Sequence, residues 1–269
     1  MNTSISSHPG AAIVTGASSG IGRVYAQHLA ARGHDVILVA RREDRLRRLA
    51  TELAGRHGVG AEVLVSDLSK PEDVARLEDR IESDASISML VNNAGFSALK
   101  PVTQTPDETI AKMIALNVTA LTLLSKAAIA AFTSRGRGAL INIGSGAGFA
   151  PYPGIPVYGA TKAYVYLFTQ SLQSEVEDTP VRVQLVLPGA VVSEGWEVAG
   201  GNDLEPLPPE IVMSTEDLVR AALRGLDLGE RVTAPSVQDE ALLRAYEAAG
   251  SRALQGAFDA TPAARYAEP

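Results

Sequence analysis

The chain has 269 residues, of which 46% are hydrophobic and 20% charged, and its formal net charge is −7. A chain of this length can form a single α/β domain, and its acidic balance argues against nucleic acid as a partner, because phosphate binding needs clustered Lys and Arg. The absence of cysteine excludes disulfides, thiolate nucleophiles and cysteine-ligated zinc.

The N-terminus and the hydropathy of the chain indicate how it is organised. Residues 1–10 contain neither the basic cluster nor the apolar run of a signal peptide, so we expect a short flexible N-terminus there. No apolar stretch approaches the roughly 20 residues of a membrane helix. We therefore expect one domain covering residues 11–269, located in the cytoplasm and without a membrane partner.

Six short runs rich in Val, Ile and Leu are apolar throughout, a pattern typical of buried parallel strands. They cover residues 12–15, 36–40, 62–66, 89–92, 140–143 and 181–187. Segments with helical periodicity lie between them. The alternation predicts an α/β fold, a doubly wound, Rossmann-like parallel sheet of about seven strands with helices on both faces. In such folds ligands bind at the carboxyl ends of the strands.

Three predicted helix starts combine a hydroxyl residue with an acidic residue three positions later, the pattern of a capping box. The pairs are Ser69 with Glu72, Thr105 with Glu108 and, as the weakest, Ser214 with Asp217. Residues 188–214 form a long irregular stretch, and its length predicts a lid over the substrate.

The first predicted strand leads into a glycine-rich turn and then a helix. The candidate cofactor-binding residues of this turn are Gly16, Ser18, Ser19, Gly20, Ile21 and Gly22. Glycines allow the backbone to approach a pyrophosphate at a helix N-terminus, although the spacing also suits a plain tight turn. The G-x-S-x-G pattern of serine hydrolases fits as well, but a hydrolase needs a His after its acid, and all four histidines lie within the first 57 residues.

The second predicted strand ends in Arg41-Arg42, at the position where enzymes that use NAD carry an acidic residue. The arginines at positions 47 and 48 have acidic residues four positions earlier and can pair with them along a helix. Arg41 and Arg42 have no such partner in the sequence. They either belong to a solvated helix face or bind a 2′-phosphate, and we favour NADP(H) as the cofactor.

Tyr158 and Lys162 are four residues apart at the start of an apolar helix and share one face. Because a nearby ammonium favours the phenolate, we expect Lys162 to lower the pKa of Tyr158. Ser145 follows the fifth predicted strand and either lies at the same sheet edge or is part of a plain Gly-rich turn. Asn117 interrupts an apolar stripe and should point inward, as a structural polar group or as the holder of a water that relays protons to Lys162.

Together these motifs resemble the short-chain dehydrogenase/reductase family over residues 11–193. The resemblance rests on the loop from Thr15 to Gly22, Asp67, Asn92-Asn93-Ala94-Gly95, Asn117, Ser145, Tyr158, Lys162, Pro188-Gly189 and Ser193. It implies a catalytic tetrad of Asn117, Ser145, Tyr158 and Lys162. It also implies a cofactor groove that includes Asp67, Leu68, Asn93, Ala94, Gly95, Tyr158, Lys162, Pro188, Gly189, Val191 and Ser193.

The expected function is an NADP(H)-dependent oxidoreductase that transfers hydride between the nicotinamide and a neutral, fairly apolar ketone, aldehyde or secondary alcohol, without a metal. No Lys or Arg occurs between Arg182 and Arg220, so an anionic substrate would find no cationic anchor in the lid. The alternative is a non-catalytic NADP-sensing or scaffold protein of the same fold. The resemblance further implies a homodimer or homotetramer, with the helices after Pro106 and Tyr158 at the interface.

Overall fold

The computed structural model describes residues 9–191 and 207–266. The chain divides into two compact units, residues 1–235 and residues 236–269, and each is described by itself. The sequence predicted one domain over residues 11–269. The second unit consists of helix α9 (Glu240–Gly256) and a short 3-10 turn, and none of the residues described in them is buried, so this unit has no core of its own.

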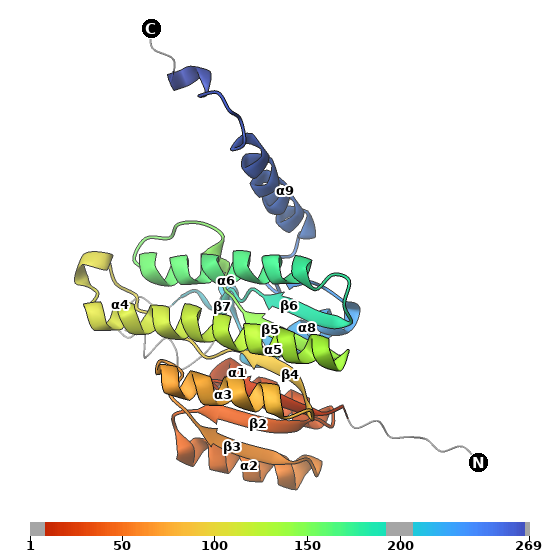
Figure 1. Ribbon diagram of the computed structural model, residues 1–269. Coiled ribbons are helices and arrows are strands. Elements are labelled where there is room, and N and C mark those ends of the chain that lie inside the picture. The colour runs from red at the N-terminus through yellow and green to blue at the C-terminus, as the bar shows by residue number, and fades with distance from the viewer. Residues whose placement is uncertain (1–8, 192–206, 267–269) are drawn as a thin grey trace. The chain divides into compact units, whose positions relative to one another are not determined.

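The first unit is organised around a parallel sheet of seven strands, in agreement with the predicted doubly wound fold (Figure 1). The strand order is β3-β2-β1-β4-β5-β6-β9. The strands are β1 (Ala11–Thr15), β2 (Asp35–Ala40), β3 (Ala61–Val65), β4 (Ile87–Asn92), β5 (Gly138–Ile143), β6 (Val181–Val186) and β9 (Val232–Thr233). The bounds of the six predicted strands are correct to within two residues. The strand order reverses at β1, which pairs with β2 on one side and β4 on the other, so a crevice is expected there.

Helices cover both faces of this sheet, which explains why its strands are apolar throughout. One face is covered by α1 (Gly20–Ala31), α2 (Glu43–His57) and α8 (Thr215–Leu228). The other is covered by α3 (Pro71–Ser83), α5 (Leu121–Arg135) and α6 (Pro156–Glu175), which lie in front of the sheet in Figure 1. Alternate residues of each strand pack into the two cores, with Val14 and Leu38 on one side and Ile13 and Val39 on the other.

The helical run Asp107–Arg135 combines α4 (Asp107–Ile114), a π-helical turn and α5. By length and composition alone it is apolar enough to cross a membrane, a feature that the sequence-based expectation missed because Lys112 and Lys126 interrupt the apolar residues. Buried side chains of α5 pack against α3, β4 and β5, the placement of a core helix in a globular domain.

Two of the three predicted capping boxes are wrong. The N-cap position of α3 is Lys70 and not Ser69, whose hydroxyl donates instead to the Asp67 carboxylate at 2.7 Å. The Thr105 hydroxyl donates to the Pro101 carbonyl at 3.0 Å. The weakest candidate is the real cap, because the Ser214 hydroxyl accepts from the backbone N–H of Asp217 at 3.0 Å. Local hydrogen bonds with preceding loops compete for the other two hydroxyls.

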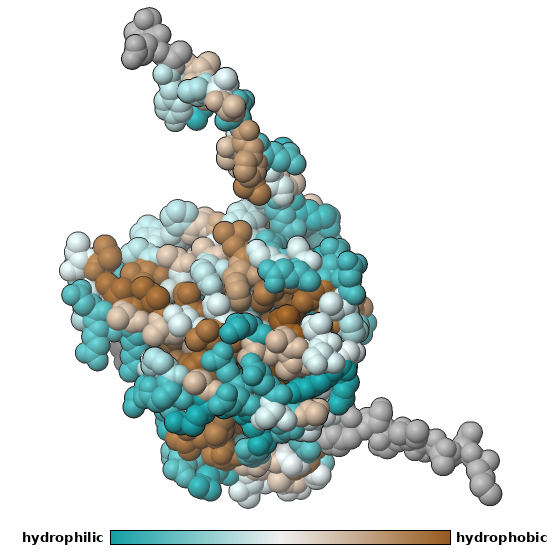
Figure 2. Space-filling model, in the orientation of Figure 1, coloured by the Kyte–Doolittle hydropathy of each residue, from teal (hydrophilic) through white to brown (hydrophobic). Residues whose placement is uncertain are grey.

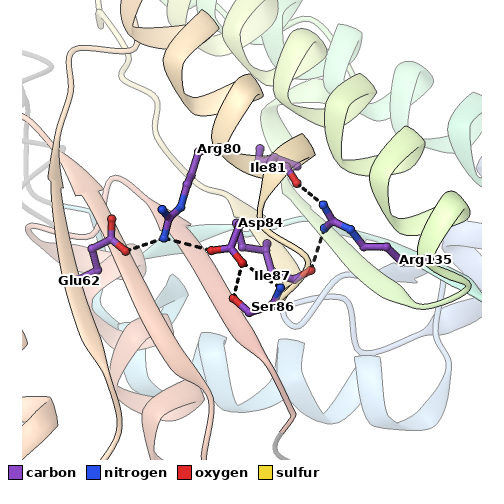
Figure 3. Close-up of polar contacts among 7 residues, drawn as sticks. All are labelled: Glu62, Arg80, Ile81, Asp84, Ser86, Ile87 and Arg135. Atoms are coloured by element: carbon purple, nitrogen blue, oxygen red, sulfur yellow. Dashed lines mark hydrogen bonds and ion pairs between the residues drawn. The ribbon is translucent and has the colours of Figure 1, made fainter.

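A polar clasp ties the amino ends of the strands together, at the edge of the sheet opposite the crevice. Arg135, at the end of α5, donates to the carbonyl oxygens of Ile81 at 2.7 Å and Ile87 at 3.2 Å (Figure 3). It also donates to the Glu82 carbonyl at 2.9 Å. It thereby satisfies the last carbonyls of α3 from another helix. Arg80 forms ion pairs with Glu62 on β3 and with Asp84, the residue that follows α3.

The predicted lid, residues 188–214, is described only at its two ends. Strands β7 (Ala190–Val191) and β8 (Val212–Met213) pair in parallel as a separate two-stranded sheet, and a 3-10 turn (Pro209–Ile211) leads into β8. Residues 192–206 lie outside the described part of the chain.

Candidate active site

The turn between β1 and α1 brings the backbone of the glycine loop close to the turn after β4. Gly16 and Gly20 adopt left-handed conformations with φ of 70° and 51°. A Cβ atom at Gly22 would lie 2.5 Å from both the Gly16 carbonyl oxygen and the Asn93 Nδ2 atom. The loop therefore needs glycine at these positions, and α1 begins at Gly20 with its N-terminal N–H groups beside the crevice.

Thr15, the last residue of β1, fastens this loop to the turn after β4. Its hydroxyl accepts from the backbone N–H groups of Asn93 and Ala94, both at 2.9 Å, and donates to the Val91 carbonyl at 3.1 Å. The Asn93 Nδ2 atom in turn donates to the Thr15 carbonyl at 2.8 Å. The glycine loop and the turn after β4 are thus held in a fixed relation, and Gly95 follows directly in the sequence.

The two arginines after β2 occupy different places. The Arg42 guanidinium lies over the glycine loop and donates to the hydroxyls of Ser18 at 2.9 Å and Ser19 at 2.6 Å. Arg41 is exposed, and its charge acts on Asp67 after β3. The arginines at positions 47 and 48 pair with acidic residues along α2, as predicted. A cationic corner therefore lies beside the glycine loop, separate from the ion pairs of α2.

Asp67 and Leu68 lie at the end of β3, on the same edge. Burial alone would raise the pKa of Asp67, but hydrogen bonds from Ser69 and the charges of Arg41 and Lys112 together hold it below its usual value. Leu68 is buried. Asp67 is therefore ionised at neutral pH and can accept a hydrogen bond from a ligand.

Ser145, Tyr158 and Lys162 converge at the carboxyl end of β5. The Ser145 and Tyr158 side chains are joined by a hydrogen bond, and Ser145 also accepts from the backbone N–H of Ala147 at 3.1 Å. The Lys162 Nζ atom lies 5.7 Å from the centre of the Tyr158 ring and donates to the Ile143 carbonyl at 2.8 Å. Two hydroxyls and an ammonium thus face one another, as the sequence predicted.

The pKa shifts of this cluster differ from the prediction. Burial raises the pKa of Tyr158, and the hydrogen bond from Ser145 offsets this only in part. Burial also lowers the pKa of Lys162 to about 8. The expected direction for Tyr158 is wrong for the protein alone, because the cost of burying a phenolate outweighs the stabilising groups around it.

Asn117 lies in the π-helical turn Ala115–Ala120 and is 1% exposed, so it points inward as predicted. Its Oδ1 atom accepts from the backbone N–H of Phe96 at 3.1 Å, and its Nδ2 atom donates to the Phe96 carbonyl at 2.9 Å and to the Thr161 hydroxyl at 3.1 Å. The Thr161 hydroxyl donates to the Tyr158 carbonyl at 2.7 Å. The side chain of Asn117 is therefore a structural link between the turn after β4 and the first turn of α6. Its role in a water relay stays a prediction.

The hydrolase interpretation of the glycine loop does not fit this geometry. The Ser18 hydroxyl is engaged by Arg42, while His28 contacts Glu216 at 2.6 Å and His34 contacts the Gly10 carbonyl at 3.1 Å. Neither of these two histidines is placed to activate a serine.

Comparison with known proteins identifies the family. The profile of the family described as short chain dehydrogenase matches residues 10–200, well over half of the chain. The chain belongs to the short-chain dehydrogenase family. It is accordingly an oxidoreductase, and its Rossmann-like sheet and convergent Ser, Tyr and Lys side chains agree with that assignment.

Two solved dehydrogenase structures are similar along nearly the whole chain. One, from Sphingobium yanoikuyae in complex with NADPH, is 43% identical with a TM-score of 0.91 and covers 96% of this chain and 100% of its own. A bulky-bulky ketone specific alcohol dehydrogenase from Comamonas testosteroni is 37% identical with a TM-score of 0.88 and covers 96% and 99%.

Curated relatives match a smaller share of the chain, and their names give different substrates. A very-long-chain 3-oxoacyl-CoA reductase from Anas platyrhynchos is 34% identical over 79% of this chain and 67% of its own. Sulfoacetaldehyde reductase 2 from Chromohalobacter salexigens is 39% identical over 71% and 76%.

The remaining predicted residues of this short-chain dehydrogenase follow β6. The Pro188 carbonyl accepts from the backbone N–H of Gly146 at 2.8 Å, which places Pro188-Gly189 beside the Ser145 turn. Val191 is buried in β7. Ser193 lies outside the described residues.

Sequence reasoning missed two residues that shape the site. Thr161 connects Asn117 to Tyr158, and Gly148 packs so closely on α6 that a Cβ atom there would lie 2.8 Å from the Lys162 carbonyl oxygen. A signal for Thr161 was present, namely a hydroxyl residue between Tyr158 and Lys162. Nothing local to the Gly-rich turn indicated which of its glycines would touch the helix.

Proposed function

We propose that this chain catalyses NADP(H)-dependent hydride transfer between the cofactor and neutral, fairly apolar ketones or secondary alcohols. The observation that carries the proposal is the convergence of Ser145, Tyr158 and Lys162 at the same sheet edge as the glycine loop. A proton donor and an anion-binding helix N-terminus thus lie at the same edge of the sheet.

The crevice has the features that NADP(H) needs. The close-packed glycines and the N–H groups of α1 suit a pyrophosphate, and Asp67 suits the adenosine. Arg42, held over the loop by Ser18 and Ser19, and the exposed Arg41 offer two cations to a 2′-phosphate. The relative crystallised in complex with NADPH supports this choice. Lys162 would hold the nicotinamide ribose, and the bound cofactor would supply or accept the hydride.

The protein's own part in the reaction is proton transfer and orientation. In the reductive direction, Ser145 and Tyr158 hold the carbonyl oxygen, and Tyr158 gives its proton to that oxygen as the alcohol forms; in oxidation it accepts the proton. The raised pKa of Tyr158 keeps the phenol protonated, which suits its role as the acid in reduction. Lys162 places a positive charge beside the phenolate that results.

The substrate proposal rests on the residues near the catalytic turn. Phe149 packs edge-to-face on Tyr166 with ring centres 5.7 Å apart, and Phe96 is fixed through its backbone by Asn117. The sequence from 183 to 219 contains no Lys or Arg to anchor an anionic group. The relative named as specific for bulky ketones supports an apolar substrate, whereas acyl-CoA and sulfonate substrates carry anionic groups.

The experiment is NADPH oxidation with a matched panel of carbonyl compounds. Bulky aryl and alkyl ketones should be reduced with higher kcat/KM than a 3-oxoacyl-CoA or sulfoacetaldehyde, and NADPH should be preferred over NADH. A preference for the anionic compounds would overturn the substrate proposal. A folded protein that binds NADPH but reduces no member of the panel would favour the sensor alternative.

A homo-oligomer built through α4 and α6 in the cytoplasm is part of the same proposal. Figure 2 shows apolar residues on the face that carries these helices, and Ile114, Tyr164 and Leu167 are exposed there. Light scattering tests this interface. The wild-type protein should be an oligomer and Leu167→Glu should weaken it, whereas a wild-type monomer would contradict the proposal.

A further inference from the structure

A network of buried polar side chains crosses the core between the sheet and the helices α5 and α6. The Asn92 Nδ2 atom donates to the Asn142 Oδ1 atom on the neighbouring strand and to the Ser125 hydroxyl, both at 3.0 Å. The Asn142 Nδ2 atom donates to the Thr169 hydroxyl at 3.1 Å, and this hydroxyl donates to the Val165 carbonyl at 2.7 Å. Asn92 is 4% exposed and the other three polar side chains are fully buried, so these hydrogen bonds are shielded from water.

The network joins the four elements that carry the candidate active site. One of its side chains comes from each of β4, α5, β5 and α6. Strand β4 leads into the turn with Asn93, and the π-helical turn with Asn117 leads into α5. Strand β5 leads into Ser145, and α6 carries Tyr158 and Lys162. The network therefore lies beneath the site and connects the elements from which its groups project.

The position that these hydrogen bonds impose explains the network better than the stability that they add. A buried amide or hydroxyl is costly unless it is hydrogen-bonded, and a satisfied pair can be replaced by apolar groups of the same shape with little loss. A hydrogen bond nevertheless requires a defined distance and angle between its partners, whereas apolar contacts allow a helix to slide over a sheet. A fully paired network thus fixes the helix in one place.

Thr169 is the member of the network that lies on α6. Tyr158 and Thr169 are about three helical turns apart, roughly 16 Å along the axis, and share one face of the helix. Helix α6 also contacts β5 through Lys162, whose Nζ atom donates to the Ile143 carbonyl at 2.8 Å. The lysine stem is long and flexible, whereas the short threonine side chain is restricted at its first torsion. The bond from Asn142 to Thr169 therefore limits movement of the helix more strictly.

We propose that Asn142 and Thr169 are positioning residues, whose hydrogen bond sets the place of α6 along β5 and thereby holds the Tyr158 hydroxyl against Ser145. Both residues are fully buried, so they act through the helix and not by contact with substrate. The proposal rests on the proposed role of Tyr158 as the proton donor. Displacing reacting groups by about 1 Å can lower a rate about a hundredfold, so a small shift of α6 is enough to reduce turnover.

Thr169→Val tests the proposal, because it preserves the size of the side chain and removes only the hydroxyl. We expect kcat for the best ketone of the panel to fall about tenfold. The KM of that ketone and the Kd for NADPH should stay within about twofold of wild type. Thr169→Ser restores the hydroxyl and should return kcat close to the wild-type value. Arg135→Leu, which weakens the clasp at the opposite edge of the sheet, is the control for loss of stability and should keep the wild-type kcat.

Three outcomes of these assays would overturn the proposal. They are an unchanged kcat in Thr169→Val, an equal loss of kcat in Arg135→Leu, and a serine variant as slow as the valine variant, which would point to packing of the methyl group. Thr169→Ala covers the case in which the valine variant does not fold. It removes the same hydroxyl without placing a methyl group beside the Asn142 amide, and it should show the same loss of kcat.

The pH profile of alcohol oxidation gives a second measurement, since Tyr158 acts there as the base. The hydrogen bond from Ser145 lowers the pKa of Tyr158 against the effect of burial. Weakening this bond should move the rise of kcat to higher pH in Thr169→Val, but not in Thr169→Ser or Arg135→Leu. Coincident profiles of wild type and Thr169→Val would contradict the positioning role.

Crystal structures of wild type and Thr169→Val distinguish this proposal from the proposed function. In the variant, the hydroxyls of Tyr158 and Ser145 should lie beyond hydrogen-bonding distance, about 3.5 Å. An unchanged distance between them would overturn the positioning role, whatever the activity. A displaced pair in a protein whose wild type reduces no ketone would support the positioning role and contradict only the proposed function.

Discussion

Replacing Lys162 with Met should change how the stability of the protein depends on pH. The Lys162 side chain is 7% exposed, and burial lowers its pKa to about 8 from the ordinary lysine value of 10.5. Between these two values the unfolded chain keeps the proton and the folded chain has lost it, so wild-type stability gains from rising pH. At 1.36 kcal/mol per pKa unit, the gain from Lys162 between pH 7 and pH 10.5 amounts to about 3 kcal/mol.

The assay is urea unfolding of wild type and Lys162→Met at a series of pH values from 7 to 10.5. The free energy of unfolding of the variant should be highest relative to wild type at pH 7, and the difference should shrink as pH rises through 8. Lys126→Met, which removes an exposed lysine, serves as the control and should follow wild type. Parallel profiles of wild type and Lys162→Met would refute the claim that a buried ammonium is held at the site.

Three further substitutions test separate parts of the structure. Arg42→Ala should raise the Kd for NADPH by about 10- to 100-fold and leave that for NADH within about twofold, because one charge-assisted contact is lost; equal weakening of both would contradict the role in 2′-phosphate binding. Thr161→Val should lower kcat about tenfold with little change in KM, and Thr161→Ser should restore it, since only the hydroxyl positions Tyr158; an inactive Ser variant would point to packing instead. Arg135→Leu should lower the free energy of unfolding by about 2–4 kcal/mol, because the last carbonyl groups of α3 would lose their hydrogen-bond donor. Arg137→Leu, whose contact to the Ala85 carbonyl is 3.5 Å long, should cost far less, and a similar loss in both would argue against the clasp.

The fold could be predicted from the sequence because its signals are local and repeated. Strands buried on both faces are apolar throughout, and the glycine loop follows directly after the first of them. The strands β7, β8 and β9, each two residues long, gave too short a signal to be placed. The division of the chain after Pro235 was not predicted, because the periodicity of α9 does not indicate whether this helix contributes to a core.

For the candidate site, the sequence predicted which residue types gather at one edge of the sheet, but not the hydrogen bonds between them. Ser145, Tyr158 and Lys162 meet as expected, because the carboxyl ends of parallel strands share an edge. Long-range hydrogen bonds could not be foreseen. The bond from Asn117 to Thr161 joins residues 44 positions apart, and the bonds from Arg42 to the glycine loop depend on how β2 lies beside β1. The direction of the Tyr158 pKa shift likewise depends on burial, and burial cannot be deduced from the spacing of Tyr158 and Lys162 in the sequence.

The most direct test of the central claim, that Tyr158 transfers the proton, is a comparison of turnover and cofactor binding in Tyr158→Phe. The variant keeps the ring and loses only the hydroxyl, so the Kd for NADPH should stay within about twofold of wild type. Its kcat for the best ketone of the panel should fall by at least about a hundredfold, the contribution typical of a general acid. Turnover close to wild type in a variant that binds NADPH normally would contradict the mechanism.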